Sequence, residues 1–261
     1  MGKITNALKK AAEERVQRID KISKIKEMDK LVVQKMGESN VSPNVITYFD
    51  PKALITEQYK ILRTNFLSLN KNKPPKTVAI TSSLHSEGKT VTSLNLAVVL
   101  AQSVNKPKVL LIDGDMRRGK MGKYLGVDRT AGLAEVLTGQ CSIKDALFQV
   151  DIENLTLMSS GEFPENPAEL LASDEMKKLL NRVAADFDFV LIDTPPIISV
   201  TDSGTVGAMV DGVVMVVQAG RTQRGIVRRA EELLHQAHCN VVGHVLTNIE
   251  YHLPEYIYRY L

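Results

Sequence analysis

The chain has 261 residues, of which 44% are hydrophobic and 24% charged, enough for one α/β domain with an extension or for two small domains. A net charge of +3 is too small to argue for nucleic acid, and no apolar run approaches the roughly 20 residues of a membrane helix. The first residues lack the apolar core of a signal peptide, and Asn6 stands where a myristoylation signal has Ser or Thr. We therefore expect a cytoplasmic protein. Cys141 and Cys239 have no metal or redox spacing and are expected to be reduced thiols.

Residues 1–40 carry an uneven share of the charge. They hold ten Lys or Arg and six Asp or Glu, a net charge of +4. Such a segment would either fold onto the main domain or dock on a partner or a membrane surface. Its apolar residues recur every three or four positions, which predicts a helix with one apolar stripe and a basic surround: Ile4, Leu8, Ala11, Ala12, Val16, Ile19, Ile22, Ile25 and Met28.

The helical pattern stops at GESNVSPN, residues 37–44, where Gly, Ser, Asn and Pro come together. The segment LITEQYKILRTNFLSL, residues 54–69, again has the apolar spacing of a helix. We therefore expect three regions, which are an amphipathic helix and linker over residues 1–50, a main domain over 51–250 and a tyrosine-rich tail over 251–261.

Within the main domain, short apolar runs alternate with helical stretches such as 90–103 and 222–237. The runs are rich in Val, Ile and Leu without polar alternation, which is typical of strands buried on both faces. The pattern predicts an α/β fold with a doubly wound, mainly parallel sheet. The expected strands are residues 76–82, 108–113, 155–160, 188–193, 212–218 and 240–247.

The loop SSLHSEGKT, residues 82–90, follows the first of these strands and has the chemistry of a phosphate-binding loop. Lys89 would reach the β- and γ-phosphates, and the Thr90 hydroxyl would bind Mg²⁺. The pattern G-x-x-x-x-G-K-[ST] is broken, because Ser83 replaces its first glycine. The position between a buried strand and a helix still favours a nucleotide site, with ATP contacts expected at Ser86, Glu87, Gly88, Lys89, Thr90 and Val91.

Three aspartates end two further strands. Asp113 and Asp115 close VLLIDGD, and Asp193 closes FVLID. Parallel strands bring their carboxyl ends to one edge of the sheet, and buried carboxylates are costly unless they are paired or bound to a metal. We therefore expect these acids beside the phosphates, with Thr90, Asp115 and Asp193 holding Mg²⁺ directly or through water.

The last eleven residues hold four of the seven tyrosines: Tyr251, Tyr256, Tyr258 and Tyr260. Such a cluster could pack as a strand or could consist of substrates. Pro254, the acidic Glu250 and Glu255, and the lack of alternating burial favour a mobile tail over a packed strand.

These features, in this order, resemble the bacterial tyrosine kinases (BY-kinases) of exopolysaccharide and capsule export. The resemblance covers roughly residues 53–261 and includes the segments GEFPENPAELLAS and VTDSGTVGAMVDGVVMVVQAGRT and the tyrosine cluster. The family's D-x-D-x-R and D-x-x-P motifs are matched by Asp113, Asp115 and Arg117 and by Asp193 and Pro196.

The resemblance implies a P-loop autokinase of the partition-ATPase-like type, using ATP and Mg²⁺. It implies that Lys89 stabilises the transferring phosphoryl group, that Asp113 activates the tyrosine hydroxyl and that Asp115 supports the metal. Asn248, after the last strand, is a candidate contact for the adenine. The acceptors would be Tyr251, Tyr256, Tyr258 and Tyr260 of an adjacent subunit.

The same resemblance implies partners. The family's oligomerisation motif E-x-x-R-x-x-R reads Glu57, Lys60 and Arg63 here, so we expect a homo-oligomer. A membrane-embedded polysaccharide co-polymerase would activate the kinase in trans, and a protein-tyrosine phosphatase would oppose it. The protein would then lie at the inner face of the cell membrane, held there by its partner, and no nucleic acid is expected to bind.

Some residues depart from the family pattern. Ser86 stands where the family has glycine, and serine tolerates a positive φ poorly. Lys60 replaces an arginine and loses its bidentate fork, so subunit contacts would be weaker. Partition and septum-site ATPases share the fold and are one alternative, but their extra lysine is Leu84 here. A catalytically silent, nucleotide-dependent regulator of a membrane assembly is the other.

Overall fold

The computed structural model describes residues 34–35, 41–69, 75–127 and 131–249. The chain divides into one unit of residues 1–32 and another of residues 33–261, and only the second is considered below. The amphipathic helix expected near the N-terminus and the four tail tyrosines lie outside the described residues.

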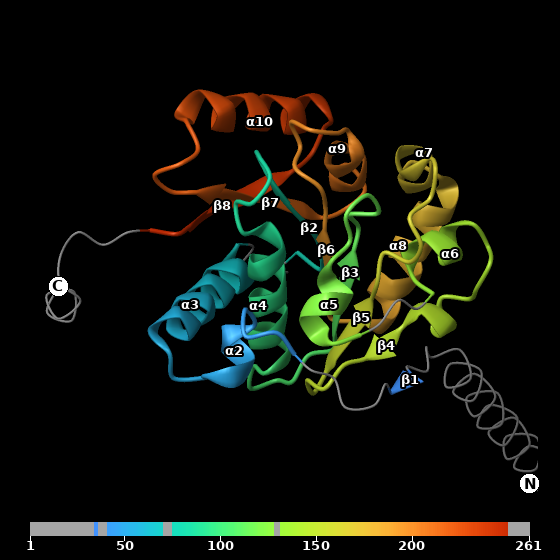
Figure 1. Ribbon diagram of the computed structural model, residues 1–261, viewed down its shortest axis with the longest axis horizontal. Helices are drawn as coiled ribbons and strands as arrows, with labels where there is room; N and C mark the ends of the chain where they lie inside the picture. The colour runs from blue at the N-terminus through green and yellow to red at the C-terminus, as the bar shows by residue number, and fades with distance from the viewer. Residues whose placement is uncertain (1–33, 36–40, 70–74, 128–130, 250–261) are drawn as a thin grey trace, which may run out of the picture. The chain divides into compact units, whose positions relative to one another are not determined.

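A mainly parallel sheet forms the centre of this unit (Figure 1). Over the described residues its strand order is β1-β4-β5-β3-β6-β2-β7-β8, and β4–β5 is the antiparallel pair. The six expected strands are confirmed to within two residues, whereas the two-residue strands β1 and β4 were not predicted. The strands are β1 Gln34–Lys35, β2 Thr77–Ser82, β3 Val109–Asp113, β4 Phe148–Gln149, β5 Leu155–Met158, β6 Phe189–Asp193, β7 Gly212–Gln218 and β8 Val241–Thr247.

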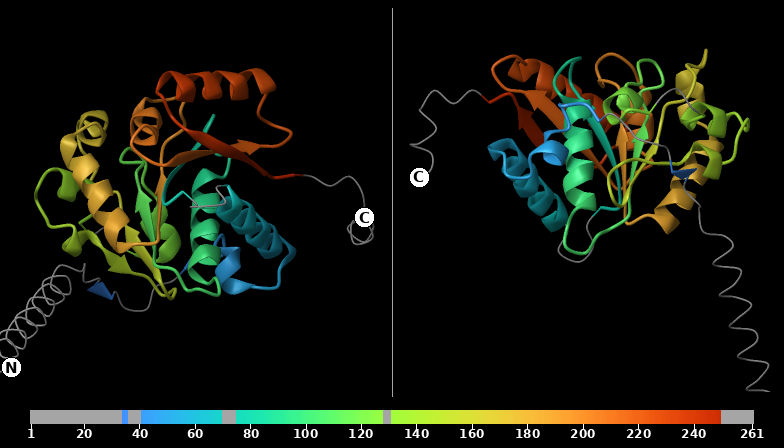
Figure 2. Two further views of the ribbon diagram at one scale, coloured as in Figure 1. Left: turned by 180° about the vertical axis from the view of Figure 1, so that it is seen from behind. Right: turned by 60° about the horizontal axis from the view of Figure 1, so that its bottom comes forward.

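Helices cover both faces of the sheet, as the doubly wound prediction requires. Helices α2–α4 lie together on one side, and α9 and α10 lie on the other, in every view (Figures 1 and 2). The described helices are α2 Ile46–Phe49, α3 Leu54–Ser68, α4 Lys89–Ala101, α5 Met121–Leu125, α6 Leu133–Leu137, α7 Pro167–Leu171, α8 Asp174–Asp186, α9 Asp202–Gly207 and α10 Arg224–Gln236, with a 3₁₀ turn at Lys144–Ala146.

Strand residues alternate between the two faces, and one hydrophobic core joins one set of them to α4. Ile80, Leu111 and Leu191 come from adjacent strands and pack in that core. The helix is buried from Thr92 to Ala101, because the sheet covers one side of it and α3 the other. This burial fixes the start of α4, and hence Lys89, against the sheet edge.

The packed body begins before residue 50. Val41 and Val45 are buried in the core, and the Thr47 hydroxyl donates a hydrogen bond of 2.9 Å to Asn95 Oδ1 on α4. On α3, Phe66 meets Phe189 edge to face at 6.0 Å. The stretch expected to be linker therefore contributes its last residues to the domain.

Among the described residues, no helix combines the length and apolar character needed to cross a membrane.

Candidate active site

The register of the sheet brings two of the expected carboxylates side by side. Strand β6 lies between β2 and β3, and Asp113 is the residue paired with Asp193 across β3 and β6. Ile80 of β2 pairs with the same Asp193, so the loop that follows β2 begins at the same edge. The strand order alone therefore gathers the three motifs that are far apart in sequence.

The loop from Ser82 to Gly88 turns through two left-handed backbone positions. Gly88, which precedes the first residue of α4, has φ of 90°, and Ser86 has φ of 63°. The serine therefore adopts the left-handed conformation for which glycine is usually chosen, at a cost on the order of 1 kcal/mol. The left-handed turn is kept, although its residue type departs from the family pattern.

Glu87 anchors this loop from inside the protein. Its carboxylate is buried and accepts hydrogen bonds from the Leu84 N–H at 2.7 Å, from the Gln218 N–H at 3.4 Å and from the Thr222 hydroxyl. The Thr247 hydroxyl, at the end of β8, donates to the Glu87 carbonyl at 2.7 Å. The ends of β7 and β8 thus hold the loop in place.

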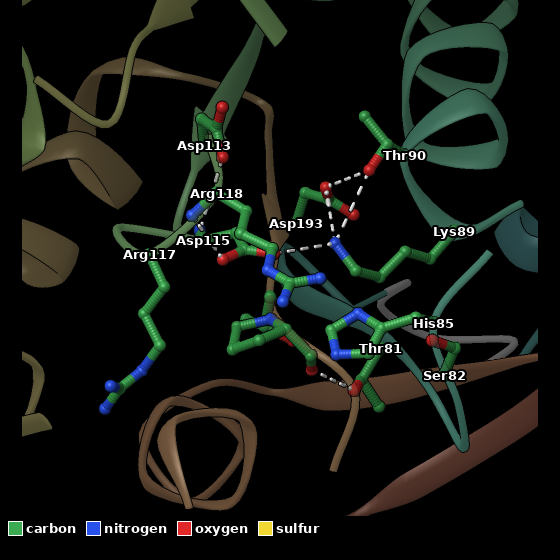
Figure 3. A network of polar contacts seen from close by, with 12 residues as sticks. Thr81, Ser82, His85, Lys89, Thr90, Asp113, Asp115, Arg117, Arg118 and Asp193 are labelled. Atoms are coloured by element: carbon green, nitrogen blue, oxygen red, sulfur yellow. Dashed lines mark hydrogen bonds and ion pairs between the residues drawn. The ribbon is translucent and has the colours of Figure 1, made fainter. Parts of the chain in front are cut away.

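Lys89 lies among the carboxylates (Figure 3). Its ammonium is 3.1 Å from Asp193 Oδ2 and 3.4 Å from Asp115 Oδ2. The Thr90 hydroxyl donates to Asp193 Oδ2 at 2.6 Å, and Ser93, one helical turn after Lys89, donates to Asp193 Oδ1 at 3.1 Å. The hydroxyls of α4 and the lysine thus share one buried carboxylate.

Burial and charge perturb two of these groups. Burial raises the pKa of Asp113 to about 7, and the neighbouring carboxylate of Asp193 adds to this effect. Asp113 nevertheless accepts hydrogen bonds from the Met121 N–H at 3.0 Å and from the Asp115 N–H at 3.2 Å. Burial alone would lower the pKa of Lys89, but Asp193 and Asp115 raise it above its usual value.

One pocket of about 200 Å³ brings most of the expected site residues together. The Glu87 side chain faces the protein interior instead, and Asn248 follows β8 without lining the pocket. An ATP contact through either residue stays a prediction. The expected residues that line the pocket are Ser86, Gly88, Lys89, Thr90, Val91, Asp113, Asp115 and Asp193.

The pocket also contains residues that the sequence analysis did not assign to the site: His85, Arg118, Lys120 and Tyr124. Three of them, Arg118, Lys120 and Tyr124, come from the segment that follows β3. This segment starts at the same edge of the sheet as the phosphate-binding loop, so its place in the sequence could have indicated that it lines the pocket. Arg117 of the D-x-D-x-R motif does not line the pocket, because it forms two hydrogen bonds, at 2.9 and 3.2 Å, to the buried carboxylate of Asp202 at the start of α9.

The donors present fit a magnesium nucleotide. A left-handed loop, a helix N-terminus, an ammonium and a hydroxyl are the groups that bind phosphates. In the part of the chain that is described, no three acidic, His or Cys side chains form a preformed metal cage. Mg²⁺ is usually held by one or two carboxylates together with substrate phosphates, so Thr90, Asp115 and Asp193 are a suitable set.

The sheet order, the GKT loop at the start of α4 and the acidic strand ends define a P-loop nucleotide-binding protein. A family model described as an AAA domain matches residues 75–236. The cell division ATPase MinD from Pyrococcus furiosus has a similar fold, with a TM-score of 0.56 at 24% identity over 66% of this chain and 71% of that one.

Proteins with higher sequence identity to this chain identify its family within the P-loop class. Tyrosine-protein kinase YwqD of Bacillus subtilis (strain 168) is 37% identical over 83% of this chain and 90% of its own length. The crystal structure of the chimerical protein CapA2B2 and the kinase domain of the Escherichia coli tyrosine kinase ETK each superpose with a TM-score of 0.74 at 29% identity. They cover 83% and 84% of this chain, and 94% and 87% of their own chains. The chain belongs to the bacterial tyrosine kinase (BY-kinase) family of protein-tyrosine kinases.

Proposed function

We propose that this protein is an ATP-dependent autokinase that phosphorylates the tail tyrosines of an adjacent copy and thereby regulates exopolysaccharide polymerisation and export. The observation that carries the proposal is the grouping of Lys89, Asp113, Asp115 and Asp193 in one pocket, at the sheet edge where β8 also ends. Since β8 runs parallel to β7, the chain leaves β8 beside that pocket and continues into the tail.

In this reaction the phenol oxygen of a tyrosine forms a bond to the γ-phosphorus of ATP, the bond from that phosphorus to the β,γ-bridging oxygen breaks, and ADP leaves. Asp113 takes the phenol proton, because a phenol with a pKa of about 10 is mostly protonated at neutral pH. A carboxylate whose pKa burial raises to about 7 is a stronger base than an ordinary aspartate.

The other groups of the pocket bind and orient the nucleotide. Lys89 binds the phosphates that gain negative charge, and Thr90, Asp115 and Asp193 hold Mg²⁺. When bound, Mg²⁺ neutralises phosphate charge. The Glu87 network keeps the phosphate-binding loop fixed, which reduces the reorganisation needed during transfer.

Chain length allows the tail to act as substrate. Tyr260 is thirteen residues beyond Thr247, a reach of at most about 43–47 Å, whereas Tyr251 has only four residues, or about 13–14 Å. The distal tyrosines can therefore reach their own pocket or a neighbour's. We propose transfer between copies because of the family resemblance and because α3 carries the expected oligomerisation motif, Glu57, Lys60 and Arg63.

Features of α3 support its role in a homo-oligomer. Leu54, Ile55 and Ile61 are each 53% exposed, which leaves apolar surface for a second copy to cover. The likeness to a chimera designated CapA2B2 supports a second partner, which we take to be a membrane polysaccharide co-polymerase that activates the kinase. A protein-tyrosine phosphatase would reverse the modification, and the kinase would act at the inner face of the membrane.

The test is to incubate the purified protein with Mg-ATP and to map phosphate by mass spectrometry. Phosphotyrosine is expected at Tyr256, Tyr258 and Tyr260, and at Tyr251 where its short reach allows. Lys89→Met should abolish the modification with the fold intact, whereas Lys177→Met, on the exposed surface of α8, should not. ATP binding without any phosphotyrosine would instead favour the catalytically silent regulator.

A mixing experiment tests transfer between copies. The Lys89→Met protein, whose tail is intact, is combined with an active protein whose four tail tyrosines are changed to Phe. Phosphate is expected on the tail of the inactive copy. If that tail stays unmodified while the wild-type protein modifies itself, transfer takes place within one chain.

A further inference from the structure

Two adjacent arginines follow β3, and their side chains point in opposite directions (Figure 3). Arg117 extends away from Lys89 and is held by Asp202, which is fully buried. The guanidinium of Arg117 is thus committed to joining the β3 loop to α9. The arginine that belongs to the family motif has a structural partner and does not line the pocket.

Arg118 points into the pocket. Its side chain extends toward the side of the site where Lys89 and His85 lie (Figure 3), and the residue lines the same pocket as Asp113 and Asp115. Its backbone is fixed, because the Arg118 N–H lies 3.1 Å from both the carbonyl oxygen and Oδ1 of Asp115. The side chain itself forms no ion pair within the described part of the chain.

The pocket contains more carboxylates than Lys89 can pair with, so a further cation would be needed beside bound phosphates. Asp113, Asp115 and Asp193 line it, and the ammonium of Lys89 is already shared between two of them, at 3.1 and 3.4 Å. Phosphoryl transfer spreads negative charge over three equatorial oxygens, and positive groups must meet that charge. Arg118 is a cation in the pocket with no ion pair to a carboxylate among the described residues, and its planar fork suits phosphate oxygens.

We propose that Arg118 is a catalytic residue that acts as an arginine finger supplied by the same chain, stabilising the charge on the transferring phosphoryl group. This inference rests on the proposed kinase function. The guanidinium gains and loses no proton, and it contributes only in the transition state, where the charge shifts. Its backbone is held by Asp115, and its side chain lines the pocket in which the phosphoryl group would pass from ATP to the tyrosine oxygen.

The test compares Arg118→Ala and Arg118→Lys with the wild type in single-turnover autophosphorylation. Arg118→Ala is expected to lower the rate about 10²- to 10³-fold, with the affinity for Mg-ADP changed less than about threefold. Arg118→Lys should recover part of the rate, because it restores charge without the fork. Added guanidinium ion should partly rescue the alanine variant and should not affect the lysine variant.

A second measurement does not depend on kinase activity. The wild-type protein should bind Mg-ADP more tightly when aluminium fluoride is present, since the fluoride mimics the transferring phosphoryl group. Arg118→Ala should lose most of this gain in affinity. Arg228→Ala, an exposed arginine of α10, is the matched control and should keep both rate and affinity. Circular dichroism and thermal unfolding verify that each variant is folded.

The inference fails if Arg118→Ala keeps the wild-type rate, or if it weakens Mg-ADP binding as much as it lowers the rate. It also fails if the fluoride complex binds the variant as tightly as the wild type. These outcomes are separate from failure of the proposed function, which would be a wild-type protein without phosphotyrosine. In that case the fluoride measurement still decides whether Arg118 contacts the terminal phosphoryl position.

Discussion

At the scale of single residues, Asp113 links the stability of the protein to pH. Its folded-state pKa of about 7 lies above the ordinary value of 3.8, so the folded protein holds a proton that the unfolded chain releases. The free energy of unfolding therefore falls as pH rises from about 4 to about 7, and the contribution is lost above that window.

We predict that Asp113→Asn removes this dependence, because an amide cannot ionise. Without nucleotide or Mg²⁺, the variant should gain stability relative to wild type as pH rises from 5 to 8, by about 2–3 kcal/mol. Urea unfolding at the two pH values measures the change. The variant should also lose autophosphorylation. An unchanged difference between the two proteins at pH 5 and pH 8 would mean that Asp113 ionises normally in the folded state.

At the candidate site, the sequence was sufficient to predict which residues lie together where position follows from strand ends and loop spacing. Lys89, Asp113 and Asp193 could be predicted because parallel strands bring such positions to one edge. The different positions of Arg117 and Arg118 could not be predicted, because Arg117 is held by Asp202, which lies far along the chain. The inward position of Glu87 likewise depends on Gln218 and Thr222.

At the scale of elements, α3 carries the motif proposed to contact a second copy, and it also packs on α4 of its own chain. The Lys60 ammonium donates hydrogen bonds to Glu57 of the same helix at 2.7 Å and to the carbonyl of Pro51, just before the helix, at 2.9 Å. Arg63 instead donates a hydrogen bond of 2.8 Å to the Val99 carbonyl of α4, so it secures the helix to its own chain. A motif assigned to contacts between copies therefore also contributes to the fold.

We predict that Arg63→Ala lowers the melting temperature by several degrees, because a hydrogen bond from a charged group is worth roughly 1.5–3 kcal/mol. Glu57→Ala, in an exposed pair, should leave it nearly unchanged. Both variants should weaken the oligomer, measured by light scattering. Asp174→Ala breaks a comparable exposed pair with Lys177 on α8 and serves as control. If Glu57→Ala leaves the assembly intact at every protein concentration, α3 is not the subunit contact.

Element prediction succeeded where a run of apolar residues was long enough to have a period. The six longer strands and α3, α4 and α10 follow from such runs. Strands β1 and β4 have two residues each and pair at the edge beside β5, so only their neighbours specify them. The packing of Val41 and Val45 was also missed, since two isolated valines after a Gly/Ser/Pro break carry no periodic signal.

At the scale of the whole molecule, residues 1–40 precede Val41, the first residue of the described core. We predict that deleting them leaves the melting temperature and Mg-ATP binding close to those of the full chain. Association with membranes that carry the co-polymerase should fall, because the basic apolar stripe is lost. Co-sedimentation measures this, with deletion of residues 250–261 as control. Equal co-sedimentation of the truncated and full chains would exclude a docking role for the stripe.

The end of β8 constrains how the protein can be labelled. Thr247 contacts the phosphate-binding loop through the Glu87 carbonyl, and its methyl group would lie 3.4 Å from a Cβ on Gly88. A fluorescent or purification domain fused after Leu261 would hang from that point by fourteen residues, at most about 46–50 Å of chain. A domain of ordinary size on so short a tether stays near the nucleotide pocket, and in the proposed function it would hinder the access of tyrosines to that pocket. Phosphotyrosine counted on such a fusion would report the tag as much as the kinase.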